Sequence, residues 1–289
     1  MNEELQKKEQ ELEEMMAMFA HKFRSPLDAI LYNTTHGNNT EIYERHAQTM
    51  RGLLDIFSII STDQTVLVSK LSKDFDGEGS LQKLLVKVID MILLHLLTEA
   101  GSDKIHQHFL SYAKRINSVP KTTDAAEWYD EYFELEEELR TAWQQGYAGL
   151  IKKSDSLDER LLWIEQYFFK LKISGFDNYI RFKEYGITES FLVIVINEVL
   201  TNLFKYYSTD KDESAQLSWK AKDGYQVIKC SNPSNKSERL EDKGSYKGHK
   251  FLSAIARKTG SKFIKPEIQD NFSLEFAIAN NLLIKGEAE

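Results

Sequence analysis

Apolar residues recur at seven-residue intervals at the start of the chain, with Glu, Lys and Gln between them. The seam positions are Leu5, Leu12, Met16, Phe19 and Phe23. This heptad pattern is typical of helices that pair along an apolar stripe. The period continues past Pro26, so we expect one long helix with a kink. It should end within residues 35–39, where Gly and Asn favour a helix C-terminus.

A second helical pattern runs from Thr40, a preferred N-cap residue, to about Ile60. Its apolar side is formed by Ile42, Met50, Leu53, Leu54, Phe57 and Ile60. Two helices joined by a short loop form an antiparallel hairpin. One hairpin cannot bury so rich a stripe, whereas two copies can bury it in a four-helix bundle. We therefore predict that residues 1–62 form a helical hairpin that makes the protein a homodimer.

Residues 63–80 show no clear period and are interpreted as a linker. The pattern of residues 81–172 predicts a Leu-, Val- and Ile-rich helix to position 97, then two or three further helices. One of these carries an apolar stripe at helical spacing: Trp128, Tyr132, Leu135, Leu139 and Trp143. Such a stripe is typical of core packing, and a docking surface for a partner is the alternative.

From residue 173 to residue 289 the pattern becomes mixed. Thr188 can cap a helix that runs to about Tyr207, and Asp223-Gly224 is a strong hairpin turn between two alternating segments. The expected strands are 179–183, 217–221, 225–230, 262–265 and 272–279, with a polar segment at 231–248 and a helix at 250–258. The chain thus predicts an α+β protein: a helical hairpin, a helical insert and a C-terminal α/β domain.

Composition narrows the function. The chain of 289 residues has 42% hydrophobic and 28% charged residues, which is ordinary for a globular protein. Its net charge of −8 argues against a nucleic-acid or anionic-membrane surface. The single cysteine, Cys230, excludes an intramolecular disulfide and fits a reducing cytoplasm. With no signal peptide or bilayer-length apolar run apparent, we expect a cytoplasmic chain without membrane contact of its own.

His21 lies late in the first helix and begins the segment His-Lys-Phe-Arg-Ser-Pro-Leu. This segment resembles the H-box of bacterial sensor histidine kinases, which reads like H-E-L-R-T-P-L. Lys22 is the clear departure, because the family has an acidic residue there. The resemblance implies that His21 accepts a phosphoryl group from ATP.

A second motif lies in the predicted helix that begins at Thr188. Glu198 and Asn202 are four residues apart on one face, and Lys205 and Tyr206 follow. The pattern resembles the N-box of the GHKL-type (Bergerat) ATPase fold, shared by gyrase, a class of chaperones and histidine kinases. The resemblance implies that Asn202 ligates Mg²⁺ at the nucleotide phosphates, Glu198 orients or deprotonates the nucleophile, and Lys205 neutralises phosphate charge. A simple polar stripe is the alternative, but Glu and Asn suit a core-facing helix poorly.

The glycine boxes of that family are reduced here. Where the family has an aspartate that accepts a hydrogen bond from the adenine amino group, this chain has Asn232, which keeps a carbonyl acceptor without the charge. The second box is reduced to Gly244 and Gly248. The resemblance covers residues 1–62 and about 173–280.

The resemblance thus implies a histidine kinase core in two-component signalling. It would use ATP and Mg²⁺ to phosphorylate His21 and pass the group to an aspartate of a separate response regulator. The alternative is a degenerate phosphotransfer or docking module that binds a response regulator without phosphorylating itself. Lys22 and the thin glycine boxes favour this alternative, whereas Glu198 and Asn202 oppose it. A third interpretation is a helical structural protein with an unrelated α/β domain.

Overall fold

The computed structural model describes residues 64–177, 180–234, 247–268 and 270–284, with isolated positions between 26 and 54. Apart from these isolated positions, the predicted hairpin and its four-helix bundle lie outside the described residues, as do His21, Lys22 and Gly244. The described helices are α3 (Gln64–Leu71), η1 (Ser72–Asp74), α4 (Leu81–Leu96), α5 (Glu99–Ser102), α6 (His106–Arg115), α7 (Ala125–Lys153), α8 (Leu157–Tyr167), α9 (Ile187–Tyr206), α10 (Lys247–Thr259) and η2 (Asn280–Leu282). The described strands are β1 (Phe75–Ser80), β2 (Leu171–Ser174), β3 (Arg181–Phe182), β4 (Ala215–Lys222), β5 (Tyr225–Pro233), β6 (Lys262–Ile268) and β7 (Asn271–Ala279).

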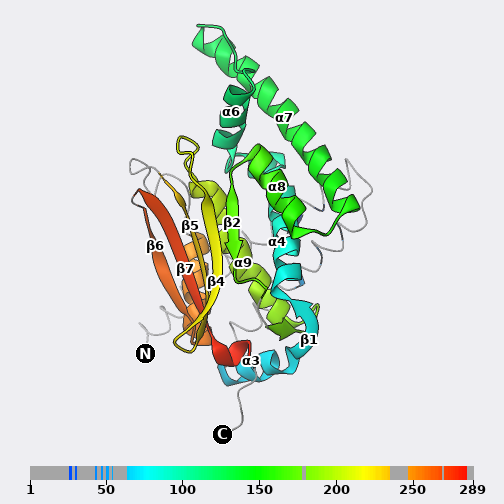
Figure 1. Ribbon diagram of the computed structural model, residues 1–289, viewed down its shortest axis with the longest axis vertical. Coiled ribbons are helices and arrows are strands. Elements are labelled where there is room, and N and C mark those ends of the chain that lie inside the picture. The colour runs from blue at the N-terminus through cyan, green and yellow to red at the C-terminus, as the bar shows by residue number, and fades with distance from the viewer. Residues whose placement is uncertain are drawn as a thin grey trace, which may run out of the picture.

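The main sheet has the strand order β2-β4-β5-β7-β6, in which β2 and β4 are parallel and the other neighbours are antiparallel. The predicted hairpin turn joins β4 to β5, and both Asp223 (φ 49°) and Gly224 (φ 79°) have the positive φ that such a turn requires. Side chains alternate along β5, where Ile228, Cys230 and Asn232 are buried. Figure 1 shows α9 and α10 together on one side of this sheet.

Helix α9 is the central helix of the fold. Its apolar run, 191–196, is buried, and the helix contacts β5, β7, α4 and α10. Of the described helices, α9 alone is long and apolar enough to cross a bilayer, but 78% of that stretch is buried inside the protein. A core helix meets the same criterion, and burial on several sides explains why its sequence is apolar nearly all round.

The segment that we predicted to be a linker contains α3, η1 and β1 in the structure. Strand β1 pairs with β3, and Asp74 lies just before it. The Asp74 carboxylate accepts a hydrogen bond from the Thr188 backbone N–H at 3.0 Å. The N-cap of α9 is Gly186 rather than Thr188, and the cap is supplied from over a hundred residues away. A Cβ on Gly186 would lie 2.3 Å from the Asp74 carboxylate, so this approach requires glycine.

The further helices expected after position 97 are α5–α8 in the structure. Helix α4 packs against α9 as part of the α/β core, and α5–α8 form the excursion between α4 and β2. Figure 1 shows α6 and α7 extending beyond the end of the sheet. In the predicted stripe of α7, Tyr132 and Trp143 are buried, whereas Trp128, Leu135 and Leu139 are half-buried. Trp143 belongs to the same apolar cluster as α4 and α9, so this stripe contributes to the core.

Candidate functional site

The last three turns of α9 carry most of the predicted site residues. Glu198 (4% exposed) and Asn202 (8% exposed) are buried on this helix. The Asn202 side-chain Nδ2 donates to the Glu198 backbone carbonyl at 2.6 Å. This bond orients the Asn202 amide and involves only its nitrogen. The bond does not use the side-chain oxygen, which is the atom that a hard cation would prefer.

The end of β5 lies beside the end of α9, because two hydrogen bonds align them. The Cys230 thiol donates to the Val199 carbonyl at 3.6 Å, and the Ser208 N–H donates to the Pro233 carbonyl at 2.8 Å. Burial raises the pKa of Cys230 to about 12, so the thiol stays protonated and acts as a donor. Asn232, between these two anchors, is therefore held at the same end of the layers as Asn202.

Asn232 has an unusual environment for a buried amide. It is 2% exposed, and its Nδ2 donates to the Pro233 carbonyl at 3.2 Å. Its side-chain oxygen is buried and has no hydrogen-bond partner among the described residues. A buried acceptor without a partner costs about 1–3 kcal/mol. A ligand that brings an N–H donor would relieve this cost.

An aromatic pair completes this end of the site. Tyr206 stacks on Phe272 with 4.6 Å between ring centroids, and Phe272 is the register partner of Asn232 on β7. The Lys205 ammonium lies 5.2 Å from the Tyr206 ring centroid. Sequence reasoning missed Phe272, which lies at the beginning of the last strand. Only the strand register places it beside Asn232.

Glu198, Asn202, Lys205 and Tyr206 thus lie in the last turns of α9, and Asn232 lies on the part of β5 that is hydrogen-bonded to this end of the helix. Gly248 lies in the first turn of α10, whose first turn carries no acidic residue. Helix N-termini favour anions through the positive end of the helix dipole. Gly244, the other residue of the second glycine box, lies outside the described residues.

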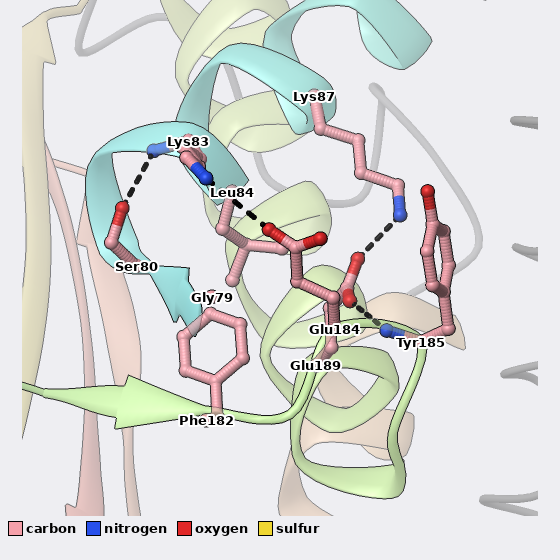
Figure 2. Close-up of a pocket in the computed structure, with 9 residues that line it drawn as sticks. All are labelled: Gly79, Ser80, Lys83, Leu84, Lys87, Phe182, Glu184, Tyr185 and Glu189. Carbon is pink, nitrogen blue, oxygen red and sulfur yellow. Dashed lines mark hydrogen bonds and ion pairs between the residues drawn. The ribbon is translucent and has the colours of Figure 1, made fainter. Parts of the chain in front are cut away.

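A cleft of about 110 Å³ lies at the opposite end of α9, roughly 20 Å along the helix axis from Asn202. Figure 2 shows that the Glu189 carboxylate there binds both the Lys87 ammonium and the Tyr185 N–H. Lys83 pairs with Glu184 at 3.4 Å. Each of these charged groups has an ion-pair or hydrogen-bond partner within the protein. The Lys87–Glu189 ion pair connects α4 to the start of α9, and we do not take this cleft as the candidate site.

Comparison with solved structures finds histidine kinase domains. The histidine kinase domain of the Erythrobacter litoralis EL346 blue-light activated histidine kinase is 10% identical, with a TM-score of 0.33, covering 62% of this chain and 100% of that chain. The Acinetobacter baumannii histidine kinase AdeS is 12% identical, with a TM-score of 0.30, covering 61% of this chain and 94% of that chain. No family model and no curated protein matches the chain. Both TM-scores are below 0.5, so these likenesses carry no functional conclusion for this chain.

Proposed function

We propose that this chain is a histidine kinase core of GHKL type that binds ATP with Mg²⁺, phosphorylates His21 and passes the phosphoryl group to an aspartate of a separate response regulator. The proposal rests on the resemblance of the sequence motifs and on the geometry at the end of α9. It includes a cytoplasmic homodimer, formed through the N-terminal hairpin of residues 1–62. The catalytic domain would comprise the α/β core, with α5–α8 as an insert.

The observation that carries the proposal is the unpartnered side-chain oxygen of Asn232. Adenine carries an exocyclic amino group, a donor that would satisfy this acceptor. The bond from Nδ2 to the Pro233 carbonyl keeps the donor end of the amide occupied, so the oxygen is the end left for a base. Guanine presents a carbonyl at the equivalent position, and that group cannot donate. The site therefore favours adenine.

The residues of α9 would hold the polyphosphate. Asn202 offers an amide oxygen, which suits Mg²⁺, and Lys205 supplies a positive charge. Mg²⁺, when bound with ATP, would neutralise charge on the transferring phosphoryl group. Glu198 would orient the attacking imidazole or accept its proton.

The reaction would be an in-line displacement. A neutral imidazole nitrogen of His21 attacks the γ-phosphorus, the bond from that phosphorus to the β,γ-bridging oxygen breaks, and ADP leaves. The protein contributes positioning and charge stabilisation, since phosphoryl transfer needs little covalent help. Lys22 favours the alternative of a docking module that does not phosphorylate itself. The family's acidic residue at this position can accept a hydrogen bond from the imidazole, and a lysine cannot.

Nucleotide binding provides the first test. Asn202→Asp removes the donor to the Glu198 carbonyl and places a negative charge beside that carbonyl and the phosphates. Titration of a fluorescent ATP analogue with and without Mg²⁺ should show at least about a tenfold loss of Mg²⁺-dependent affinity. Asn197→Asp makes the same chemical change at a half-exposed position of α9 and should bind normally. Equal affinity in wild type and Asn202→Asp would remove Asn202 from the site.

Labelling with γ-labelled ATP separates the kinase from the degenerate module. The wild type should incorporate acid-labile, base-stable phosphate, and His21→Gln should incorporate none. Nucleotide binding without any labelling of the wild type would instead support the docking module. Label retained in His21→Gln would mean that another of the seven histidines is the acceptor.

A further inference from the structure

The C-terminal end of α9 is held by side chains from the helical insert. The last carbonyls of a helix have no partner within the helix and need one from elsewhere. The Phe204 carbonyl accepts a hydrogen bond from His108 Nε2 at 3.1 Å, and the Tyr207 carbonyl accepts one from Gln107 Nε2 at 2.8 Å. Both donors lie on α6, about a hundred residues earlier in the chain.

Packing fixes the His108 ring in this position. His108 is 1% exposed, and its ring lies against Phe168, Phe169 and Tyr207, with centroid distances of 5.2, 5.6 and 5.9 Å. Phe169 in turn stacks on Tyr207 at 4.2 Å. Because the acceptor is a carbonyl, Nε2 must carry the proton that is donated. A buried ring with one donor direction and aromatic neighbours has little freedom to rotate.

The Phe204 and Tyr207 carbonyls, which accept these hydrogen bonds from α6, flank the proposed nucleotide site. Phe204 and Tyr207 are immediate neighbours of Lys205 and Tyr206, and Asn202 lies half a turn earlier on α9. Any rotation or fraying of this last turn would displace the Tyr206 ring and the Lys205 ammonium together. The hydrogen bonds from α6 therefore act at the point where α9 meets the proposed ligand.

The helical insert, which carries His108 and Gln107, is itself bound to the core by buried contacts. The Asp90 carboxylate on α4 binds Tyr147 of α7 at 2.7 Å and Arg160 of α8 at 3.0 Å, and all three side chains are buried. Helix α4 packs on α9, and Phe109 of α6 packs on Trp143 of α7 at 4.7 Å. Helix α6 is thus held against α9 by a rigid support and not by a flexible loop.

We propose that His108 and Gln107 are positioning residues for the nucleotide site: they set the last turn of α9, and the helical insert is a built-in support of the site. This deepens the proposed function and rests on it. Neither side chain need touch the nucleotide. Their effect would run through the Phe204 and Tyr207 carbonyls.

The test compares four variants of the full-length chain. His108→Ala removes the donor, and His108→Gln keeps an N–H donor at a similar reach. His106→Ala is the neighbouring control, because His106 lies two residues away on α6 and contacts Glu136 of α7. Phe176→Leu is the stability control, since it weakens the packing of the buried Phe176 ring on Trp219 of β4, outside the helical insert. Mg²⁺-dependent affinity for a fluorescent ATP analogue is measured at a temperature where circular dichroism shows every variant folded.

We expect His108→Ala to weaken this affinity about tenfold, and His108→Gln to recover most of the loss. His106→Ala and Phe176→Leu should stay within about twofold of the wild type. Hydrogen exchange gives a second readout: amides 205–208 should exchange faster in His108→Ala than in His106→Ala.

Unchanged affinity in His108→Ala would overturn the inference, as would an equal loss in Phe176→Leu. A wild type that binds no nucleotide is instead a failure of the proposed function. In that case the hydrogen exchange of amides 205–208 is the remaining test of whether α6 stabilises the last turn of α9. Equal exchange rates in His108→Ala and wild type would reject the inference.

Discussion

The buried cluster of Asp90, Tyr147 and Arg160 should be the most sensitive polar feature of the described structure. Arg160 binds Asp90 with two nitrogens, at 3.0 and 3.2 Å, and also donates to the Ser154 carbonyl. Tyr147 donates to the same carboxylate at 2.7 Å. Burial, together with the negative charge of Asp90, holds the pKa of Tyr147 well above its ordinary value, so the phenol remains a neutral donor.

Removing one partner leaves a buried charge without compensation. Asp90→Asn keeps the shape but leaves the Arg160 guanidinium, which is 0% exposed, without its counter-ion. Breaking a buried pair in this way costs about 3–5 kcal/mol. Tyr147→Phe removes one hydrogen bond to a carboxylate that Arg160 still neutralises, so about 1.5–3 kcal/mol is expected. Replacing both charges with apolar residues, Asp90→Leu with Arg160→Met, should cost far less than Asp90→Asn.

Urea unfolding monitored by circular dichroism measures these free energies from the midpoint and slope. Lys83→Ala is the control, because the Lys83–Glu184 pair is exposed and should contribute less than about 0.5 kcal/mol. A loss below about 1 kcal/mol in Asp90→Asn would refute the argument that the charge is desolvated. An equal loss in the paired apolar variant would show that shape, and not charge compensation, decides stability here.

Further predictions concern His106, Asn232 and Lys22. The hydrogen bond with Glu136 raises the pKa of His106 above its ordinary 6.5, so this pair stabilises the fold below pH 6.5 and loses its effect as the pH rises through the raised pKa. His106→Gln should lower the free energy of unfolding in urea more at about pH 5.5 than at about pH 9, by less than ~1 kcal/mol because His106 is half-exposed. Equal losses at the two pH values would contradict this. Asn232→Leu should leave urea stability within about 1 kcal/mol, because an unpartnered buried acceptor is removed, yet weaken the ATP analogue about tenfold; unchanged analogue affinity would reject the base contact. Lys22→Glu should raise the initial rate of His21 labelling in single-turnover experiments, since a carboxylate can accept a hydrogen bond from the imidazole; a slower variant would assign Lys22 a role of its own.

Local sequence patterns predicted several of the helices, strands and turns of the fold. The apolar run before Asn197 and its polar continuation predicted one long helix, and α9 spans Ile187–Tyr206. Asp223-Gly224 predicted the β4–β5 turn, because few other residue pairs accept positive φ at both positions. The spacing of Glu198 and Asn202 placed both on one helix, where the structure has them buried. Such features depend on residues close in sequence, so their physical causes are visible in the sequence.

The sequence by itself determined which residues could form helices, strands and turns, and which polar groups stood at unusual positions. The tertiary structure decided what those groups meet. Asp74 lies in a segment without helical period, and only folding shows that it caps α9. His108 and Gln107 belong to an insert with no motif, yet they reach the last turn of α9. Contacts across a hundred residues depend on which surfaces pack together, and that is set by the summed burial of the whole core and not by any local period.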